Sequence, residues 1–351
     1  MKLSAYTLSL LADIEKRINP EAEEDFLAQW RRFWNGEVDG VIFTPKRKVL
    51  SQPSVEVMPI NINDAIGDYD LMLASQLGRV SEALASGSRA LTVRANYGTG
   101  ILSSLFGAEI FTMPREQNTL PTTRPLGDSD KMRALLDGGI PSLTSAFGRN
   151  VFEFGEMYLE ICKNYPKIAK YVYMYHPDTQ GPLDIAELLW GADMFYAMYD
   201  DTELVHSLMR LFTDTYRAFL DKWFAMYPNK EDLNAHWDFL MRGTICLRND
   251  SAMNLAPEQY EEFAFPYDRE LFDYYGGGIL HYCGRGDHYI DILTALPSLT
   301  GINLSQPHLN DMDTVYRAAF GNGKRLLDLT RAACDDYEKQ PDAVRGMIFC
   351  Y

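Results

Sequence analysis

The feature that most constrains the fold is a regular alternation of short apolar segments and helical segments towards the end of the chain. Strands are expected at 243–247, 278–283, 301–304, 324–329 and 346–350, with helices at 257–275, 287–296, 313–320 and 335–344. Neighbouring strands that are separated by a helix pair in parallel, because a parallel pair needs a long crossover connection. The connections here are short, and a short-looped series of this kind predicts an α/β fold, a (β/α)₈ TIM barrel.

The length of the chain fits one such barrel. A barrel takes roughly 250 residues, and the chain has 351. We therefore expect a single domain over 1–351, with a helical and irregular N-terminal extension at 1–85 and the barrel at 86–351.

Composition excludes several classes of protein. Acidic residues outnumber basic residues by 49 to 33, and the net charge of −16 repels nucleic acid. Apolar runs stay below the ~18 residues that a membrane span needs. The five cysteines are odd in number and widely spaced, which does not suit a disulfide framework. The N-terminus turns acidic within a few residues, unlike a signal peptide, so we expect a cytoplasmic protein.

The first candidate site lies at the end of the predicted strand 278–283. Side chains alternate between the two faces of a strand, so His281 and Cys283 share one face. Imidazole and thiolate are common zinc ligands, and a third protein ligand would be Cys350 on the last strand or Cys334 just before it. The alternative is an ordinary buried cysteine beside a hydrogen-bonded histidine.

The second candidate site follows directly, where two glycines surround an arginine. Arg285 has the fork geometry that binds a carboxylate, which suggests substrate binding. Asp287 and His288 are candidate catalytic acids or bases. The structural alternative is that Asp287 caps the next helix and His288 sits in its first turn.

Polar residues follow other predicted strands as well. Asp250 is a third candidate catalytic residue, although a polar loop that starts a helix would look the same. In barrels of this type the chemistry gathers at the carboxyl ends of the strands. The candidate substrate-binding residues are Arg94, Asn96, Tyr97, Arg248, Ser251, Arg285, Gln306 and His308.

Several of these segments together resemble one known family. A Gly-Pro helix start at 181–186, an Asp-Asp-Thr-Glu-Leu-Val helix at 200–205, an Asp-Ser…Pro-Glu-Gln-Tyr-Glu-Glu-Phe block at 250–263 and the His-Tyr-Cys-Gly strand end at 281–284 are similar to motifs of the uroporphyrinogen decarboxylase superfamily. The matches occur in order over roughly 180–310.

The resemblance implies one of two chemistries. Decarboxylases of the family carry an N-terminal arginine-rich loop, which the stretch 43–47 lacks, and an aspartate where this sequence has Asn96. The methyltransferase branch binds zinc through a His, a Cys and a later Cys, here His281, Cys283 and Cys350. We therefore expect methyl transfer from a corrinoid (methylcobalamin) on a partner protein to a thiol such as coenzyme M. The family also implies a homodimer.

Two other functions stay open at this point. One is metal-free decarboxylation of a tetrapyrrole or another carboxylated small molecule, with Arg248, Arg285 and Asp250 at the site. The other is a non-catalytic protein that binds a tetrapyrrole or corrinoid.

Overall fold

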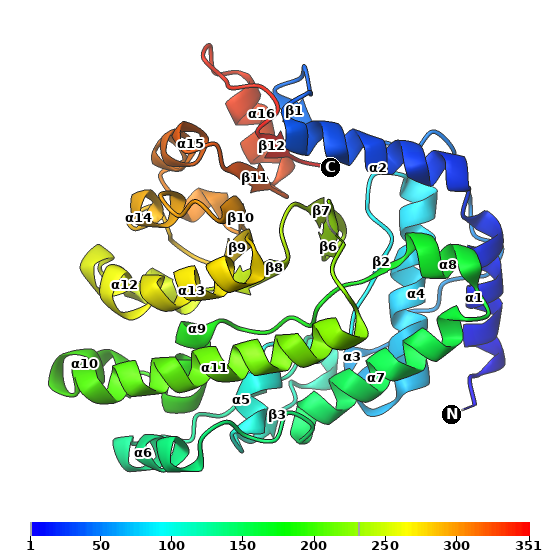
Figure 1. The fold of residues 1–351 in the computed structure, drawn as a ribbon. Coiled ribbons are helices and arrows are strands. Elements are labelled where there is room, and N and C mark those ends of the chain that lie inside the picture. Colours follow the sequence, from blue (N-terminus) through cyan, green and yellow to red (C-terminus); the bar gives the residue numbers. More distant parts are fainter. Residues whose placement is uncertain (1, 231) are drawn as a thin grey trace.

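The computed structural model describes residues 2–230 and 232–351 and alternates strands with helices along the chain (Figure 1). The strands are β1 (Ile42–Phe43), β2 (Thr92–Val93), β3 (Ile110–Phe111), β4 (Thr122–Thr123), β5 (Tyr173–Met174), β6 (Asn234–His236), β7 (Phe239–Met241), β8 (Ile245–Arg248), β9 (Gly278–Tyr282), β10 (Leu299–Leu304), β11 (Arg325–Leu327) and β12 (Ile348–Phe349).

Sixteen α-helices and three short 3₁₀ helices connect these strands within the described residues. The first eight α-helices are α1 (Ala5–Arg17), α2 (Pro20–Asn35), α3 (Ile62–Gly67), α4 (Tyr69–Ser86), α5 (Ile101–Leu105), α6 (Ser129–Gly138), α7 (Ala146–Cys162) and α8 (Pro166–Tyr171). The others are α9 (Pro182–Trp190), α10 (Asp193–Asp200), α11 (Thr202–Met226), α12 (Pro257–Phe263), α13 (Phe265–Tyr275), α14 (Ile290–Thr294), α15 (Met312–Gly321) and α16 (Arg331–Glu338). The 3₁₀ helices are η1 (Arg115–Gln117), η2 (Ser251–Asn254) and η3 (Pro307–Leu309).

Six strands form one parallel sheet in the order β1-β12-β11-β10-β9-β8. From β8 onwards each strand pairs with the next one along the chain, and the last strand pairs with the first. A second parallel pair, β2 with β5, lies beside it, and the amide of Gly181 donates to the carbonyl oxygen of Arg248 at 3.0 Å between the two groups. The α/β fold is confirmed, and this topology is compatible with a TIM-barrel-like arrangement.

The segment before the boundary expected at residue 85 contributes one strand to the six-stranded sheet. Strand β1 lies before that boundary, yet Ile42 and Phe43 pair with Ile348 and Phe349 of β12. A strand of two residues is too short to show the alternation of apolar and polar side chains by which a strand is recognised in a sequence. The first 85 residues therefore supply helices and also the edge strand β1 of the six-stranded sheet.

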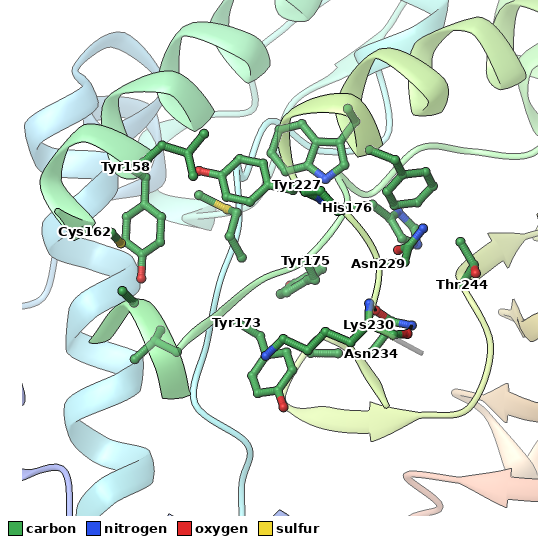
Figure 2. A pocket seen from close by; sticks show the side chains of 18 residues that line it. Tyr158, Cys162, Tyr173, Tyr175, His176, Tyr227, Asn229, Lys230, Asn234 and Thr244 are labelled. Atoms are coloured by element: carbon green, nitrogen blue, oxygen red, sulfur yellow. Dashed lines mark hydrogen bonds between the residues drawn. The ribbon is translucent and has the colours of Figure 1, made fainter. Parts of the chain in front are cut away.

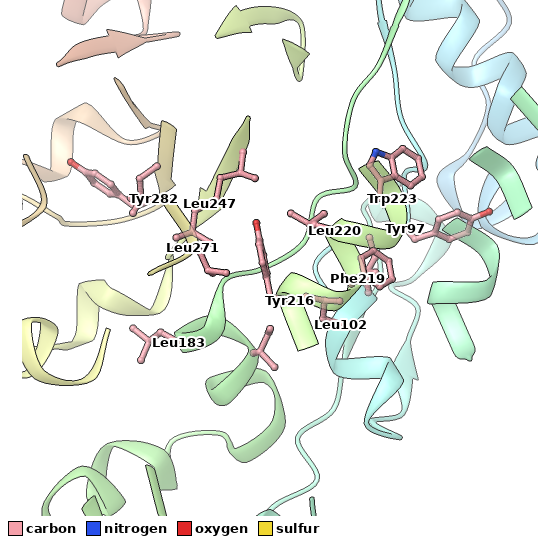
Figure 3. Packing of buried hydrophobic residues seen from close by; sticks show 14 of the residues in the cluster. Tyr97, Leu102, Leu183, Tyr216, Phe219, Leu220, Trp223, Leu247, Leu271 and Tyr282 are labelled. Atoms are coloured by element: carbon pink, nitrogen blue, oxygen red, sulfur yellow. The ribbon is translucent and has the colours of Figure 1, made fainter. Parts of the chain in front are cut away.

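The two faces of the six-stranded sheet pack against different partners. Phe43, Cys246, Ile279, Leu327 and Phe349 belong to one buried cluster, together with aromatic side chains of α2 and residues of β7. The alternate strand residues belong to a larger cluster with the outer helices, and Figure 3 shows Leu247 of β8 near Leu271 of α13 and Tyr216 of α11. The alternation follows directly from the two-residue repeat of a strand.

An antiparallel hairpin, β6–β7, stands apart from this parallel pattern. It joins His236 to Phe239 through the two-residue turn Trp237-Asp238, and β7 packs in the same inner cluster as the strands of the sheet. In Figure 1 the hairpin lies towards the centre, between β8 and β2. The carbonyl of Asp238 accepts a hydrogen bond from the amide of Ala90 at 2.7 Å, which fixes the hairpin tip next to β2.

The long helix α11 begins within the Asp-Asp-Thr-Glu-Leu-Val segment at 200–205. The side chain of Asp201 accepts a hydrogen bond from the amide of Leu204 at 3.3 Å and caps the helix. Its buried residues recur every three or four positions, as an amphipathic helix requires. Across the described chain, helices fall short of the combined length and apolarity required to cross a bilayer.

Candidate functional site

The carboxyl ends of β8 and β9 bring three potential metal ligands together. Asp250, His281 and Cys283 each offer one ligand atom, and these three atoms lie within 4.8 Å of one another. The strands are in register with Arg248 opposite His281, so the residues just beyond the strand ends are neighbours. The amide of Cys283 donates to Oδ1 of Asp250 at 2.7 Å and fixes the two loops together.

The imidazole of His281 has a defined orientation. Its Nδ1 is 2.6 Å from Oδ1 of Asn303, and Nδ2 of Asn303 donates to the carbonyl oxygen of Leu327 at 2.7 Å. The amide oxygen of Asn303 is therefore the acceptor, and Nδ1 of His281 carries the proton. This leaves the lone pair of Nε2 directed at Sγ of Cys283 (3.5 Å) and Oδ1 of Asp250 (3.6 Å). Burial, with Arg248 nearby, lowers the pKa of His281 and favours this neutral form.

The thiol of Cys283, unlike the neutral imidazole of His281, must lose its proton before it can bind a metal. Burial and the neighbouring carboxylate of Asp250 raise its pKa to about 11, although the hydroxyl of Ser305 donates to Sγ at 3.1 Å. A cation between the three groups would offset this penalty, because a coordinating thiol loses its proton. One carboxylate, one neutral imidazole and one thiol are a donor set suited to zinc.

A buried carboxyl group supports the loop that carries Asp250. Asp184, near the start of α9, accepts hydrogen bonds from the amides of Asp250 (3.1 Å) and Ser251 (2.7 Å). Gln180 donates to Oδ2 of Asp250 at 3.2 Å. Burial, and then the charge of Asp250, raise the pKa of Asp184 to about 7. The sequence prediction did not include Asp184, although it lies inside the Gly-Pro helix start.

Next to the three ligands lies a second buried polar group. Asp178, which follows β5, forms an ion pair with Arg248 at 2.6 Å and another with Arg94. Burial opposes ionisation of Asp178, but the two guanidinium groups hold its pKa well below the ordinary value. Nη2 of Arg248 is also 3.1 Å from Nε2 of His236. Arg94 and Arg248, two of the three arginines expected to bind substrate, therefore have an internal carboxylate partner, which the sequence prediction missed.

Trp237 at the tip of the hairpin contacts both polar groups, through Arg248 of the Asp178 group and His281 of the Asp250–His281–Cys283 group. The guanidinium of Arg248 lies 4.7 Å from the centre of its ring, and the imidazole of His281 lies 4.7 Å from it in an edge-to-face arrangement. A bulky residue at φ 46° is unusual, and the turn would ordinarily take glycine there. The sequence gives no signal for this residue, because neither the hairpin nor its turn has the usual turn composition.

The residues after Cys283 form a separate group. Nε of Arg285 is 2.6 Å from Oδ1 of Asp287, whose other oxygen accepts from the amide of Asp311 at 2.8 Å. Nε2 of His288 lies 2.9 Å from the carbonyl oxygen of Leu255. These contacts join neighbouring loops, and the structure does not place Asp287 or His288 among the three grouped ligands. Their catalytic role stays a prediction.

The remaining predicted residues are dispersed. Gln306 accepts a hydrogen bond from the amide of Gly284 at 2.6 Å, and Ser251 is held by Asp184. Asn96 and Tyr97 are buried, with the ring of Tyr97 packed 5.4 Å from that of Phe147, and His308 is exposed.

Cys350 is not among the ligands that the structure groups with His281 and Cys283. Strand alternation explains its position, because Phe349 points into the inner cluster and Cys350 therefore packs with the outer helices. The thiol of Cys334 is its neighbour there, and the pKa of Cys350 is lowered by a hydrogen bond from Cys334 and by Arg331. Asp250, and not Cys350, lies with His281 and Cys283 in the group of potential ligand atoms.

A cavity of about 510 Å³ is lined by His281, one of the three grouped residues. His281, Asn303 and Ser305 form one side of it. The other lining residues are Arg79, Arg89, Trp237, Asp238, Asp328, Leu329, Thr330, Arg331 and Tyr351. The volume is in the range of small-molecule sites, so a substrate in this cavity would reach the imidazole of His281.

Another cavity, of about 220 Å³, lies at the amino ends of β5 and β8 (Figure 2). Its wall includes Tyr173, Tyr227 and Thr244, and Nζ of Lys230 lies 3.6 Å from the centre of the Tyr173 ring. None of the three grouped ligands lines it. The carboxyl-end cavity is therefore the candidate site.

Comparison with known proteins gives a structural match and no sequence match. No protein-family model matches the chain, and no curated protein matches it. Among solved structures, a methyltransferase from Methanosarcina mazei is similar to this chain, with a TM-score of 0.61. The match covers 92% of this chain and 91% of the other at 15% sequence identity. At that identity the likeness establishes a shared fold.

Proposed function

We propose that the protein is a zinc-dependent methyltransferase of the uroporphyrinogen decarboxylase superfamily, built on a closed (β/α)₈ barrel. The reaction would move a methyl group from a corrinoid carrier to a thiol. The observation that carries the proposal is the convergence of Asp250, His281 and Cys283 at the strand ends beside a substrate-sized cavity. The shared fold with a methyltransferase adds support.

The donor set fits a catalytic zinc site. Such sites have three protein ligands and keep one position for a substrate, and His281, Cys283 and Asp250 would be the three. When bound, zinc lowers the pKa of a substrate thiol and holds it as a reactive thiolate. Asn303 keeps the proton on Nδ1 of His281, and the hydroxyl of Ser305 hydrogen-bonds to the sulfur of Cys283.

Metal-free decarboxylation has less support. The two arginines assigned to substrate carboxylates have partners within the protein, because Arg248 pairs with Asp178 and Arg285 with Asp287. A corrinoid protein as partner and a homodimeric assembly belong to the main proposal and rest on the family resemblance.

Metal analysis of the purified protein tests the site. We expect one zinc per chain in the wild type and loss of zinc in Cys283→Ser, His281→Ala and Asp250→Asn. Cys162→Ser, a thiol at the other cavity, should keep the metal. Cys350→Ser should also keep it, and loss of zinc there would restore Cys350 as the third ligand.

Methyl transfer is measured with free methylcobalamin as donor and coenzyme M or 2-mercaptoethanol as acceptor, by the change in the cobalamin spectrum. A zinc-loaded wild type that transfers no methyl group to either thiol would contradict the proposed activity.

A further inference from the structure

Two residues with a left-handed backbone conformation line the candidate cavity. Among described residues other than glycine, positive φ values occur at Asn118, Ala146, Trp237 and Asp328. Two of these, Trp237 at 46° and Asp328 at 58°, line the cavity that contains His281. Strained residues persist where the surrounding structure holds them, and they gather at functional sites.

Asp328 follows directly after β11, at the same ends of the strands as His281. It is partly buried, and the ion pairs found among residues 2–230 and 232–351 do not include it. Asp238, on the same cavity wall, is different, because Nη1 of Arg89 forms an ion pair with its carboxylate at 3.0 Å. Among the described residues, Asp328 is therefore the carboxyl group of the cavity lining that forms no ion pair.

The groups that surround Asp328 raise the pKa of its carboxyl group. Burial first, and then the negative charge of Asp238, raise its pKa to about 7, while Arg89 and a hydrogen bond with Tyr351 act in the opposite direction. Arg79, Arg331 and His281 are the other charged or titratable groups on the cavity wall. The carboxyl group can therefore change protonation state near neutral pH, as an acid–base group should.

We propose that Asp328 accepts the proton of the substrate thiol. The inference rests on the proposed function, because a thiol becomes a nucleophile only after losing its proton. The S–H bond breaks, the electron pair stays on sulfur, and the proton goes to a carboxylate oxygen of Asp328. Nε2 of His281, Cys283 and Asp250 would be engaged as ligands, and Asp238 is paired with Arg89. This leaves Asp328 as the acceptor on the wall.

The first test observes the carboxyl group directly. In protein labelled with ¹³C at the aspartate side chains, the resonance that disappears in Asp328→Asn should titrate near pH 7. Asparagine tolerates a positive φ, so this variant keeps the turn. At pH 7, adding zinc and 2-mercaptoethanol should shift that resonance towards the protonated form. Titration near pH 4, or no shift on adding the thiol, would overturn the inference.

The second test uses methyl transfer from methylcobalamin to 2-mercaptoethanol. The wild-type rate should rise with pH through about 7, since the ionised carboxylate is the active form. Asp328→Asn should bind the same amount of zinc but react about 10²-fold more slowly, without that inflection. Asp336→Asn, an exposed acid on α16 paired with Lys339, is the matched control and should behave like wild type.

The outcomes separate the two proposals. A wild type that transfers methyl groups while Asp328→Asn keeps the same rate and pH profile would overturn the role of Asp328 and leave the proposed function standing. A wild type that transfers no methyl group, but whose Asp328 takes up a proton when the thiol binds, would contradict methyl transfer and support Asp328 as the proton acceptor.

Discussion

Two polar groups lie side by side at the carboxyl ends of the strands, and they differ in how their charges are balanced. Arg94 and Arg248 share the single carboxylate of Asp178 in the protein interior. Asp250, His281 and Cys283 instead direct a carboxylate oxygen, an imidazole nitrogen and a sulfur at one another, with no cation within the set. In the first group every charged side chain has an internal partner of opposite charge, and the group supports the structure. The second has the composition of a binding site.

The largest expected effect comes from removing the carboxylate that Arg94 and Arg248 share. Asp178→Asn would leave two buried guanidinium groups without their carboxylate, so we expect a loss of about 3–5 kcal/mol in the free energy of unfolding. Urea unfolding followed by circular dichroism measures it. Asp232→Asn removes an exposed ion pair with Arg31 and should change stability by less than about 1 kcal/mol. Similar losses in both variants would mean that the Asp178 group does not stabilise the fold.

A smaller effect is expected on the zinc affinity of the group Asp250, His281 and Cys283. Asn303→Leu keeps the volume but removes the acceptor that orients His281, so we expect zinc affinity to fall about 10–100-fold. Competition with a fluorescent zinc chelator measures the affinity. Asn322→Leu, an amide at the end of α15 away from the cavity lining, is the control. Unchanged affinity in Asn303→Leu would show that the imidazole needs no such support.

The smallest effect concerns pH and the support behind β8. Asp268 accepts a hydrogen bond from Asn249 at 2.7 Å, and burial, with Asp184 nearby, raises its pKa to about 8. A raised pKa stabilises the folded state below the ordinary value near 4 and loses that contribution as pH rises towards 8. Relative to wild type, Asp268→Asn should therefore gain on the order of 1–2 kcal/mol between pH 5 and pH 7. Unfolding curves at both pH values decide it, and a constant difference would contradict the raised pKa.

Sequence reasoning was most accurate where periodicity is strong. The strands expected at 243–247, 278–283 and 301–304 correspond to β8, β9 and β10, and the helical segment expected at 257–275 corresponds to α12 and α13. The same two-residue repeat placed His281 and Cys283 on one face. Applied to the last strand, however, it gives Phe349 and Cys350 opposite faces, and only the register of the sheet shows which of them points inwards.

Other parts of the site depend on contacts between distant segments. Asn303 reaches His281 through the pairing of β10 with β9, and Asp178 meets Arg94 and Arg248 from two other strand ends. The hairpin turn Trp237-Asp238 lacks the Asn-Gly or Gly-rich pattern that usually marks such a turn. Single-sequence patterns carry no direct signal for any of these contacts.

The pairing of β1 with β12 has a consequence for how the protein folds. The hydroxyl of Thr44 donates to the carbonyl of Cys350 at 2.7 Å, which joins residues 306 positions apart. Loop-closure entropy disfavours such a contact early, whereas a hairpin such as β6–β7 closes within microseconds. We expect the hairpin β6–β7 and its aromatic neighbours to form early in folding, and the pairing of β1 with β12 to form last. Joining the two ends of the chain by circular permutation would then speed folding more than strengthening any single helix.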